Sequence, residues 1–306
     1  MVRRPLLRPF LKPLLNQPGL GMNLAGLMII GFGLVMFPGV PAYSLVEFCP
    51  AATVDEPVSS PPGMNIRAKG VVAMVPPDAS GNSALIKKQT FLSVQGRLIE
   101  AYEFGNGGRC ALVIGGVHGD EIEGVVLARA LLKYLQTLSL ADFHGKVVLM
   151  PVANPDGLKA GTRRNANKID INRNFPTNNF RSRRLSRRYN PGKKPASEPE
   201  TKAIIKIAAE YHPDLIITFH ADLNCVNYDG PGAQIAARMA ALNGMPVKAD
   251  LGYATPGSLG TYFGVERNIP VITLELRPKD HQWERHRKAI LGEIGVQETG
   301  VPDQQL

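Results

Sequence analysis

Residues 111–121 read ALVIGGVHGDE, and this segment indicates the class of fold. Its first seven residues carry no charge and run from aliphatic side chains into two glycines, which is typical of a buried strand that ends in a tight turn. Residues 123–138, EGVVLARALLKYLQTL, follow with apolar side chains at helical spacing. A buried strand that leads directly into an amphipathic helix is the repeating unit of an α/β sheet.

The alternation of strand and helix continues along the chain. Buried strands are predicted over residues 146–154, 214–220 and 270–276, and helices over residues 200–211, 233–244 and 283–295. Strands that are apolar throughout need cover on both faces of their sheet. The sequence therefore predicts an α/β fold: a three-layer α/β/α sandwich with a mixed, largely parallel central sheet, preceded by an N-terminal hydrophobic leader or anchor. In such sheets, functional groups gather at the carboxyl ends of the strands.

The N-terminal segment is typical of an export signal or a single membrane anchor. Its first twelve residues carry four basic side chains and no acid, and residues 24–37 form an apolar run that ends at Pro38. We expect residues 1–48 either to be cleaved near Ala42 or to remain in the inner membrane through residues 13–46.

Behind this segment, the composition separates a linker from a folded domain. Residues 49–85 are rich in proline, which predicts a linker and an extended lead-in. Residues 86–306 are sized for one domain, which we expect outside the cytoplasm, either in the periplasm or attached to the cytoplasmic membrane. The three cysteines, Cys49, Cys110 and Cys225, form no CxxC motif, so a metal site must rely on histidines and carboxylates.

The positive charge is concentrated in two stretches. The chain carries a net charge of +9, of which the first twelve residues contribute +4 and residues 181–194, RSRRLSRRYNPGKK, contribute +7, leaving −2 elsewhere. Beyond Tyr189, these runs lack the interleaved aromatic side chains on which nucleic-acid bases stack. We therefore expect no nucleic-acid partner. The second run is either a rim that attracts an anionic partner or a solvated loop.

Polar side chains stand where the predicted strands end. His118 and Glu121 follow the first strand, His220 ends another, and Glu275 closes a third. A capped helix start would explain a histidine and a glutamate three residues apart, but not their coincidence with polar groups at two other strand ends. Two histidines and one glutamate leave an open position on Zn²⁺ for water, as catalytic zinc sites do.

A second polar cluster comprises residues 161–165, GTRRN, and residues 170–175, DINRNF. Arginines among asparagine and glycine in a loop can bind a carboxylate through parallel hydrogen bonds and stabilise an oxyanion. A basic loop for some other anionic partner explains the composition equally well.

These motifs occur together in a recognisable order. The motifs HGDE, NPDG (154–157), TR (162–163), DINRNF, a strand ending in histidine, and TLEL (273–276) together resemble the zinc metallocarboxypeptidase family of carboxypeptidase A type. Within that family, residues 154–176 and the run CVNYDGP (225–231) most resemble bacterial members that remove meso-diaminopimelate from the peptide of peptidoglycan.

The resemblance implies one Zn²⁺ per chain, with His118, Glu121 and His220 as its ligands. It also implies that Asp170 fixes the tautomer of the His118 ring. Glu275 would be the general base, which takes a proton from zinc-bound water and passes it to the leaving amine.

The same resemblance implies how the substrate is held. Asn172 and Arg173 would bind its terminal carboxylate, and Arg163 would polarise the scissile carbonyl, with Arg164 as the adjacent candidate. A free carboxylate beside the scissile bond makes such an enzyme exo-acting.

Two further residues have open interpretations. Tyr253 resembles the mobile tyrosine that closes over substrate in the family, although a buried turn tyrosine would have the same sequence. Asp229 either recognises the far amino group of diaminopimelate or forms a structural Asp-Gly turn.

The expected activity is zinc-dependent cleavage of the γ-D-glutamyl–meso-diaminopimelate bond of murein peptides, by glutamate-assisted attack of zinc-bound water. One alternative is an acyl-amino-acid deacylase of the aspartoacylase or succinylglutamate desuccinylase type. A non-catalytic, membrane-attached murein-binding protein is an alternative of another class. If the protein cleaves murein peptides, the basic run of residues 181–194 would form a rim that attracts murein peptide or membrane phospholipid.

Overall fold

The computed structural model describes residues 70–74, 84–183, 186 and 188–298. The predicted leader, residues 1–48, lies outside the described residues, as does most of the predicted linker. Across the part that is described, no helix is long and apolar enough to cross a membrane. The first described strand, residues 70–74, lies within the stretch predicted as linker and lead-in.

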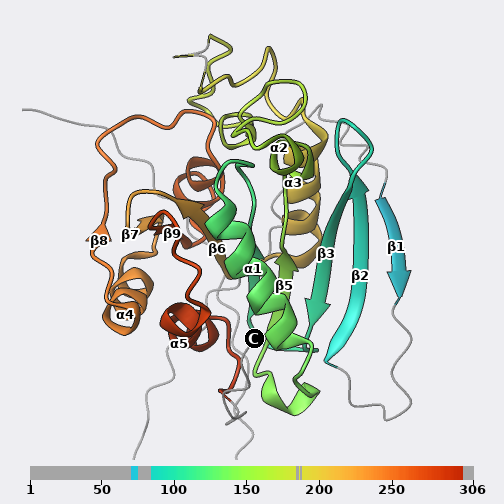
Figure 1. The fold of residues 1–306 in the computed structure, drawn as a ribbon, viewed down its shortest axis with the longest axis vertical. Helices are drawn as coiled ribbons and strands as arrows, with labels where there is room; N and C mark the ends of the chain where they lie inside the picture. The colour runs from blue at the N-terminus through green and yellow to red at the C-terminus, as the bar shows by residue number, and fades with distance from the viewer. Residues whose placement is uncertain (1–69, 75–83, 184–185, 187, 299–306) are drawn as a thin grey trace, which may run out of the picture. The chain divides into compact units, whose positions relative to one another are not determined.

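The described chain forms a mixed nine-stranded sheet with the order β1-β2-β3-β5-β4-β6-β9-β7-β8 (Figure 1). The strands are β1 (Gly70–Met74), β2 (Leu85–Leu92), β3 (Leu98–Phe104), β4 (Cys110–Ile114), β5 (Lys146–Met150), β6 (Leu215–Ala221), β7 (Cys225–Asp229), β8 (Val247–Lys248) and β9 (Val271–Leu276). The strands predicted from the apolar runs, β4, β5, β6 and β9, are its four central members.

The expectation of a largely parallel sheet is correct for this centre and for the short β7–β8 pair, but not for the other pairs. Strands β5, β4, β6 and β9 are mutually parallel, but β1, β2, β3 and β5 pair antiparallel in succession, and so do β9 and β7. For β2 and β3 the reason is the short turn between them, in which Arg97 O accepts a hydrogen bond from Ser93 N at 2.9 Å. A turn of this length can only join antiparallel strands.

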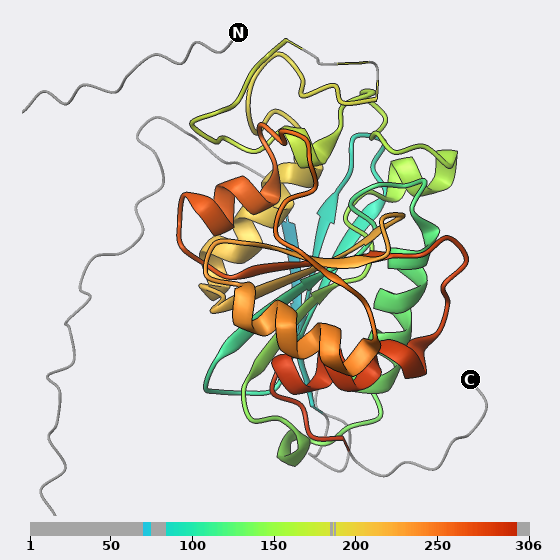
Figure 2. The same ribbon diagram turned by 90° about the vertical axis from the view of Figure 1, so that its left-hand side faces the viewer.

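Helices cover both faces of the sheet (Figure 2). They are α1 (Ile122–Leu135), α2 (Pro155–Ala160), α3 (Pro199–Tyr211), α4 (Ala233–Asn243) and α5 (Trp283–Glu293), with short helical turns η1 (Leu140–Asp142), η2 (Ile171–Arg173) and η3 (Gly260–Val265). Strand β4 shows the layering, because Ala111 and Val113 pack with α1, α4 and α5 while Leu112 and Ile114 pack with α3 and η3. The three-layer α/β/α prediction is therefore confirmed for the described chain.

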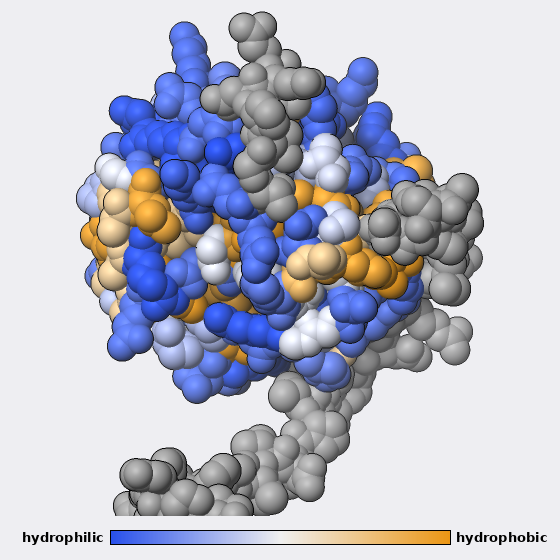
Figure 3. All heavy atoms as spheres, turned by 90° about the horizontal axis from the view of Figure 1, so that it is seen from below, coloured by the Kyte–Doolittle hydropathy of each residue, from blue (hydrophilic) through white to orange (hydrophobic). Residues whose placement is uncertain are grey.

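The parallel centre sends its carboxyl ends toward the loops that lie at the top of Figure 1. The loop after β4, the end of β6 and the end of β9 meet there, because β6 pairs in parallel with both β4 and β9. The opposite end of the molecule, seen from below in Figure 3, carries hydrophilic residues interrupted by small apolar groups among the residues described.

The loop after β4 packs tightly against the start of α2. Asn154 caps that helix, with its Oδ1 accepting from Gly157 N at 2.9 Å. The backbone of Gly119 approaches Gly157 and Leu158 so closely that a Cβ atom would overlap their backbone atoms. Glycine at position 119 therefore allows the two loops to touch.

Replacing Gly119 should consequently destabilise the protein. We expect Gly119→Ala to lower the free energy of unfolding by at least about 2 kcal/mol, because the obstructing atoms belong to the backbone and cannot rotate away. The matched control is Gly292→Ala in α5, where an added Cβ meets nothing within 4 Å, and where alanine should raise stability by about 0.5 kcal/mol. Thermal and denaturant unfolding measure both, and equal stability of the two variants would contradict the packing described.

Candidate active site

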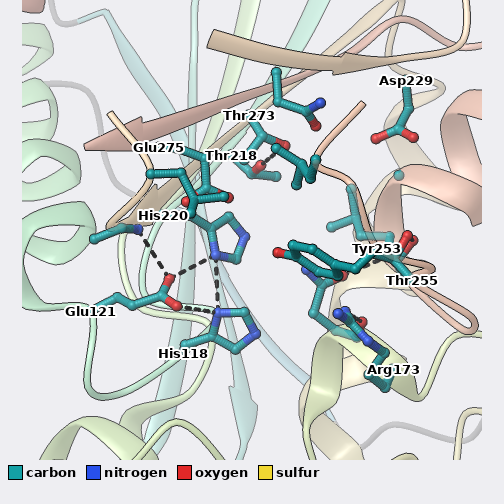
Figure 4. Close-up of a pocket in the computed structure, with 18 of the residues that line it drawn as sticks. His118, Glu121, Arg173, Thr218, His220, Asp229, Tyr253, Thr255, Thr273 and Glu275 are labelled. Carbon is teal, nitrogen blue, oxygen red and sulfur yellow. Dashed lines mark hydrogen bonds and ion pairs between the residues drawn. The ribbon is translucent and has the colours of Figure 1, made fainter. Parts of the chain in front are cut away.

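Two histidines and one glutamate converge at the carboxyl ends of β4 and β6. His118 Nδ1 lies 2.9 Å from Glu121 Oε1, and His220 Nδ1 lies 2.8 Å from Glu121 Oε2 and 3.0 Å from His118 Nδ1. All three side chains are buried, and one ligand atom from each lies within 4.8 Å of the others. Figure 4 shows the three side chains pointing toward one another.

Asp170 supports this cluster from behind. It is fully buried, its Oδ1 lies 3.2 Å from His118 Nε2, and its Oδ2 accepts from Arg163 Nε at 3.0 Å. Burial alone would raise the pKa of the Asp170 carboxyl, but His118 and the two neighbouring arginines, Arg163 and Arg173, hold that pKa well below its usual range. Asp170 is therefore a permanent anion in contact with the His118 ring.

The donor set fits a zinc ion. An ionised Asp170 can only accept, so Nε2 of His118 is the donor in their contact and Nδ1 of the neutral ring carries its lone pair toward Glu121. Two imidazole nitrogens and one carboxylate are ligands that zinc prefers, and three protein ligands leave a position open, as in catalytic sites. A carboxylate on the outer nitrogen of a ligating histidine is the usual arrangement around such ions.

Arg163 is already engaged within the cluster. Besides its bond to Asp170, its Nη1 donates to Glu121 Oε1 at 2.9 Å. The family resemblance implies that this guanidinium polarises the scissile carbonyl, whereas in the structure two of its donors bind the carboxylates of Glu121 and Asp170. The adjacent candidate, Arg164, does not line the pocket among the residues described, whereas Arg163 lines it and is held by Glu121 and Asp170.

Glu275 stands beside His220 at the end of β9 (Figure 4). The two residues are paired directly across the parallel strands β6 and β9, and both line the same pocket. Burial is the main reason that the pKa of the Glu275 carboxyl is raised, and the negative charge of Glu121 raises it further. A carboxylate with a raised pKa is suited to take up and release a proton during a reaction.

Arg173 is a buried cation without an acidic partner. It is 4% exposed, its Nη1 donates to the backbone oxygen of Asn172 at 2.7 Å, and its buried Nε has no hydrogen-bond partner. Among the described residues no carboxylate lies within ion-pair distance of it, and burial lowers the pKa of its guanidinium. Such a group is ready to receive an anion.

A pocket of about 260 Å³ connects these groups. It is lined by the three residues of the histidine and glutamate cluster and by Arg163, Asn172, Arg173, Asp229, Tyr253 and Glu275. The structure thus brings together every predicted site residue except Arg164, which points elsewhere, and Asp170, which lies beneath the cluster. Tyr253 is 47% exposed and stands across the pocket from His220 (Figure 4), where a closing side chain would start.

Asp229 forms the far side of this pocket. Its carboxylate has no hydrogen bond or ion pair with another described residue, and burial raises its pKa. Gly260 allows this placement, because a Cβ there would overlap Asp229 Oδ2.

Sequence reasoning missed three polar residues of the same wall, namely Thr218, Asn227 and Thr273. The hydroxyls of Thr218 and Thr273 lie 3.0 Å apart. Each threonine stands two residues before a predicted site residue of its strand, His220 or Glu275, and side chains two apart in a strand share a face. This spacing was the signal that could have found them.

The fold and the site together define a zinc-dependent hydrolase of peptide or amide bonds. Residues 79–234, half of the chain, match the family described as zinc carboxypeptidase. The chain belongs to this family, and its cofactor is zinc. Membership of the zinc carboxypeptidase family favours an enzyme over a non-catalytic murein-binding protein.

Individual relatives narrow the comparison. Murein peptide amidase A of Escherichia coli K12 is 36% identical over 178 residues, which cover 55% of this chain and 71% of that protein. Murein peptide amidase A of Vibrio campbellii is 33% identical over 193 residues, covering 59% and 75%. The crystal structure of the murein-tripeptide amidase of Escherichia coli O157 superposes with a TM-score of 0.56 at 27% identity, covering 68% of this chain and 90% of that one.

The contact between Asp170 and His118 predicts a measurable effect on the metal. We expect Asp170→Asn to weaken zinc binding about 10- to 100-fold, because the His118 ring loses the anion that orients it and makes its nitrogen more basic. Competition with a chromogenic chelator measures the affinity.

Asp156→Asn is the matched control. Asp156 is also buried and accepts from Arg97 Nη1 at 2.6 Å, but it touches none of the cluster. This variant should lose stability and keep its zinc affinity within about threefold. Equal zinc affinities of the two variants would mean that Asp170 does not support the site.

Proposed function

We propose that this enzyme removes meso-diaminopimelate from murein peptides by hydrolysing its bond to γ-D-glutamate. The observation that carries the proposal is the charge of the pocket: in the part of the chain that the structure describes, Arg173 is buried with no anion in ion-pair contact, and Asp229 has no cation in such contact. The similarity to murein peptide amidases supports the same substrate.

Arg173 and Asn172 would bind the carboxylate next to the scissile bond. Asn172 is held in place because its Oδ1 accepts from Leu259 N at 2.8 Å, which leaves its amide group free to donate toward the pocket. A buried guanidinium gains most from a charged acceptor, since it has lost its own hydration. This requirement favours cleavage at a chain end over cleavage within a chain.

Asp229 would bind the distal amino group of diaminopimelate. Thr218, Thr273 and Asn227 lie on the same wall and offer hydroxyl and amide groups to the rest of the polar side chain. This wall disfavours a large apolar side chain, because such a group would cover the Asp229 carboxylate without giving it a partner.

Glu275 would carry the proton during hydrolysis. A bound zinc ion polarises the scissile carbonyl and lowers the pKa of a water molecule. The Glu275 carboxylate takes one proton from the attacking water and delivers it to the nitrogen of the leaving amine. Its buried place beside His220 keeps this carboxylate away from bulk water.

Arg163 would contribute to charge stabilisation from its place between Glu121 and Asp170. Its guanidinium lines the pocket, so its positive charge acts on an oxyanion that develops there. We propose this role as the electrostatic complement of zinc.

The deacylase alternative shares the metal ligands, and sequence favours the peptidase because NPDG and DINRNF are complete. We also propose that the enzyme acts outside the cytoplasm, in the periplasm or at the outer side of the inner membrane, where murein lies. That part of the proposal rests on the N-terminal sequence pattern alone.

The direct test is incubation of the purified chain with L-Ala-γ-D-Glu-meso-diaminopimelate. We expect release of diaminopimelate that stops on complete chelation and returns with added zinc, measured by chromatography of the products. Glu275→Gln should bind zinc normally and lose at least about 100-fold in kcat. Release that survives zinc removal, or release of ordinary C-terminal amino acids alone, would contradict the proposal.

A second prediction concerns substrate preference. Asp229→Ala should lower the preference for diaminopimelate over alanine at the C-terminal position about 10- to 100-fold, because one charge-assisted hydrogen bond is lost. The ratio of the two kcat/KM values measures it. Asp250→Asn, which removes another negative charge from the pocket lining, should leave the ratio within about threefold. Full preference in Asp229→Ala would assign Asp229 to the Asp-Gly turn alone.

A further inference from the structure

The basic run of residues 181–194 contributes one aromatic side chain to the active site. Tyr189 lines the pocket, with the guanidinium carbon of Arg163 at 5.3 Å and that of Arg173 at 5.1 Å from the centre of its ring. Both distances are within the range of a cation–π interaction. One ring thus contacts both arginines that face the substrate.

The backbone holds this ring in place. Asn190, the next residue, accepts from Asp170 N through its backbone oxygen at 2.8 Å and donates from Nδ2 to Lys168 O at 2.7 Å. On the other side, Tyr189 N donates to the Ser186 hydroxyl at 3.3 Å. The segment is therefore fastened to the loop that carries Asp170, rather than lying free above the pocket.

The two arginines differ in what else holds them. Arg163 has two carboxylate partners, Glu121 and Asp170, whereas Arg173 contacts, among the described residues, a backbone oxygen and the ring. Arg173 also experiences the repulsion of Arg163 and the cost of burial. The charge of Asp170 offsets part of these costs from beyond ion-pair distance, and the face of the Tyr189 ring lies against the guanidinium before a substrate arrives.

We propose that Tyr189 is a positioning residue of the carboxylate-binding wall, whose ring holds the guanidiniums of Arg163 and Arg173 apart and shields Arg173 from water. The basic run then acts at the site by supplying this ring. The kinetic part of the test rests on the proposed function, and the labelling part does not.

The first measurement is the rate at which phenylglyoxal modifies Arg173 in the purified, zinc-loaded chain, followed by peptide mass spectrometry. Tyr189→Leu should raise this rate about tenfold, because the shield is removed, while Tyr189→Phe keeps the ring and should stay within about threefold of wild type. Tyr189→Met, of similar length but without a π face, is the second variant in case the leucine variant folds poorly.

The second measurement is kinetic, with the diaminopimelate tripeptide. Tyr189→Leu should raise KM about tenfold and change kcat less than about threefold, since the ring acts on the group that holds the substrate carboxylate. Inhibition by free diaminopimelate should weaken by the same factor. Arg183→Ala is the control for the basic run, because Arg183 is exposed and does not line the pocket, and it should change neither value.

The outcomes separate the two proposals. A wild-type enzyme that does not release diaminopimelate overturns the proposed substrate, and the labelling rates then decide the role of Tyr189. Unchanged labelling of Arg173 in both Tyr189→Leu and Tyr189→Met overturns the positioning role. The positioning role is also overturned if these variants melt at a lower temperature while the labelling rate of Arg173 and the KM stay at wild-type values. Tyr189 would then be a purely structural residue.

Discussion

The site depends on one fully buried carboxylate. Asp170 contacts His118, accepts from Arg163 and also accepts from Asn172 N at 3.0 Å. These contacts join the metal-ligand cluster, the arginine beside it and the turn that carries Asn172 and Arg173. Because an anion buried alone would be very unfavourable, each contact is needed to keep Asp170 charged, and Asp170 in turn fixes each partner. The chain thus assembles its metal-ligand cluster and the proposed substrate-binding wall around a single charge.

The parallel centre of the sheet explains why residues far apart in sequence meet with such accuracy. His220 and Glu275 are paired across β6 and β9, and so are Thr218 and Thr273 two positions earlier. One register therefore places both the reactive and the recognition groups on the same edge. Antiparallel β7 then returns beside β9 and brings Asp229 to the far side of the pocket. The mixed sheet separates the metal cluster from the recognition wall.

Sequence patterns predicted the strands that are apolar on both faces, because an uninterrupted apolar run differs clearly from the sequence on either side of it. They missed β2 and β3, in which polar and charged residues, such as the consecutive Lys87 and Lys88, interrupt the apolar ones. The ligand cluster was predictable because its residues follow strand ends. Tyr189 was not, since its place depends on the hydrogen bond from Asp170 N to Asn190 O, which no periodicity encodes.

The distribution of charge in the pocket favours a zwitterionic ligand over an anionic or a cationic one. If Arg173 and Asp229 could reach each other, they would form an ion pair and lose their affinity for a substrate. No such pair exists in the described structure, and burial disfavours the charged form of both side chains. A ligand with a carboxylate near Arg173 and an amino group near Asp229 relieves both costs at once. A ligand with one charge relieves only one, so the same geometry that binds the proposed substrate selects against simpler amino acids.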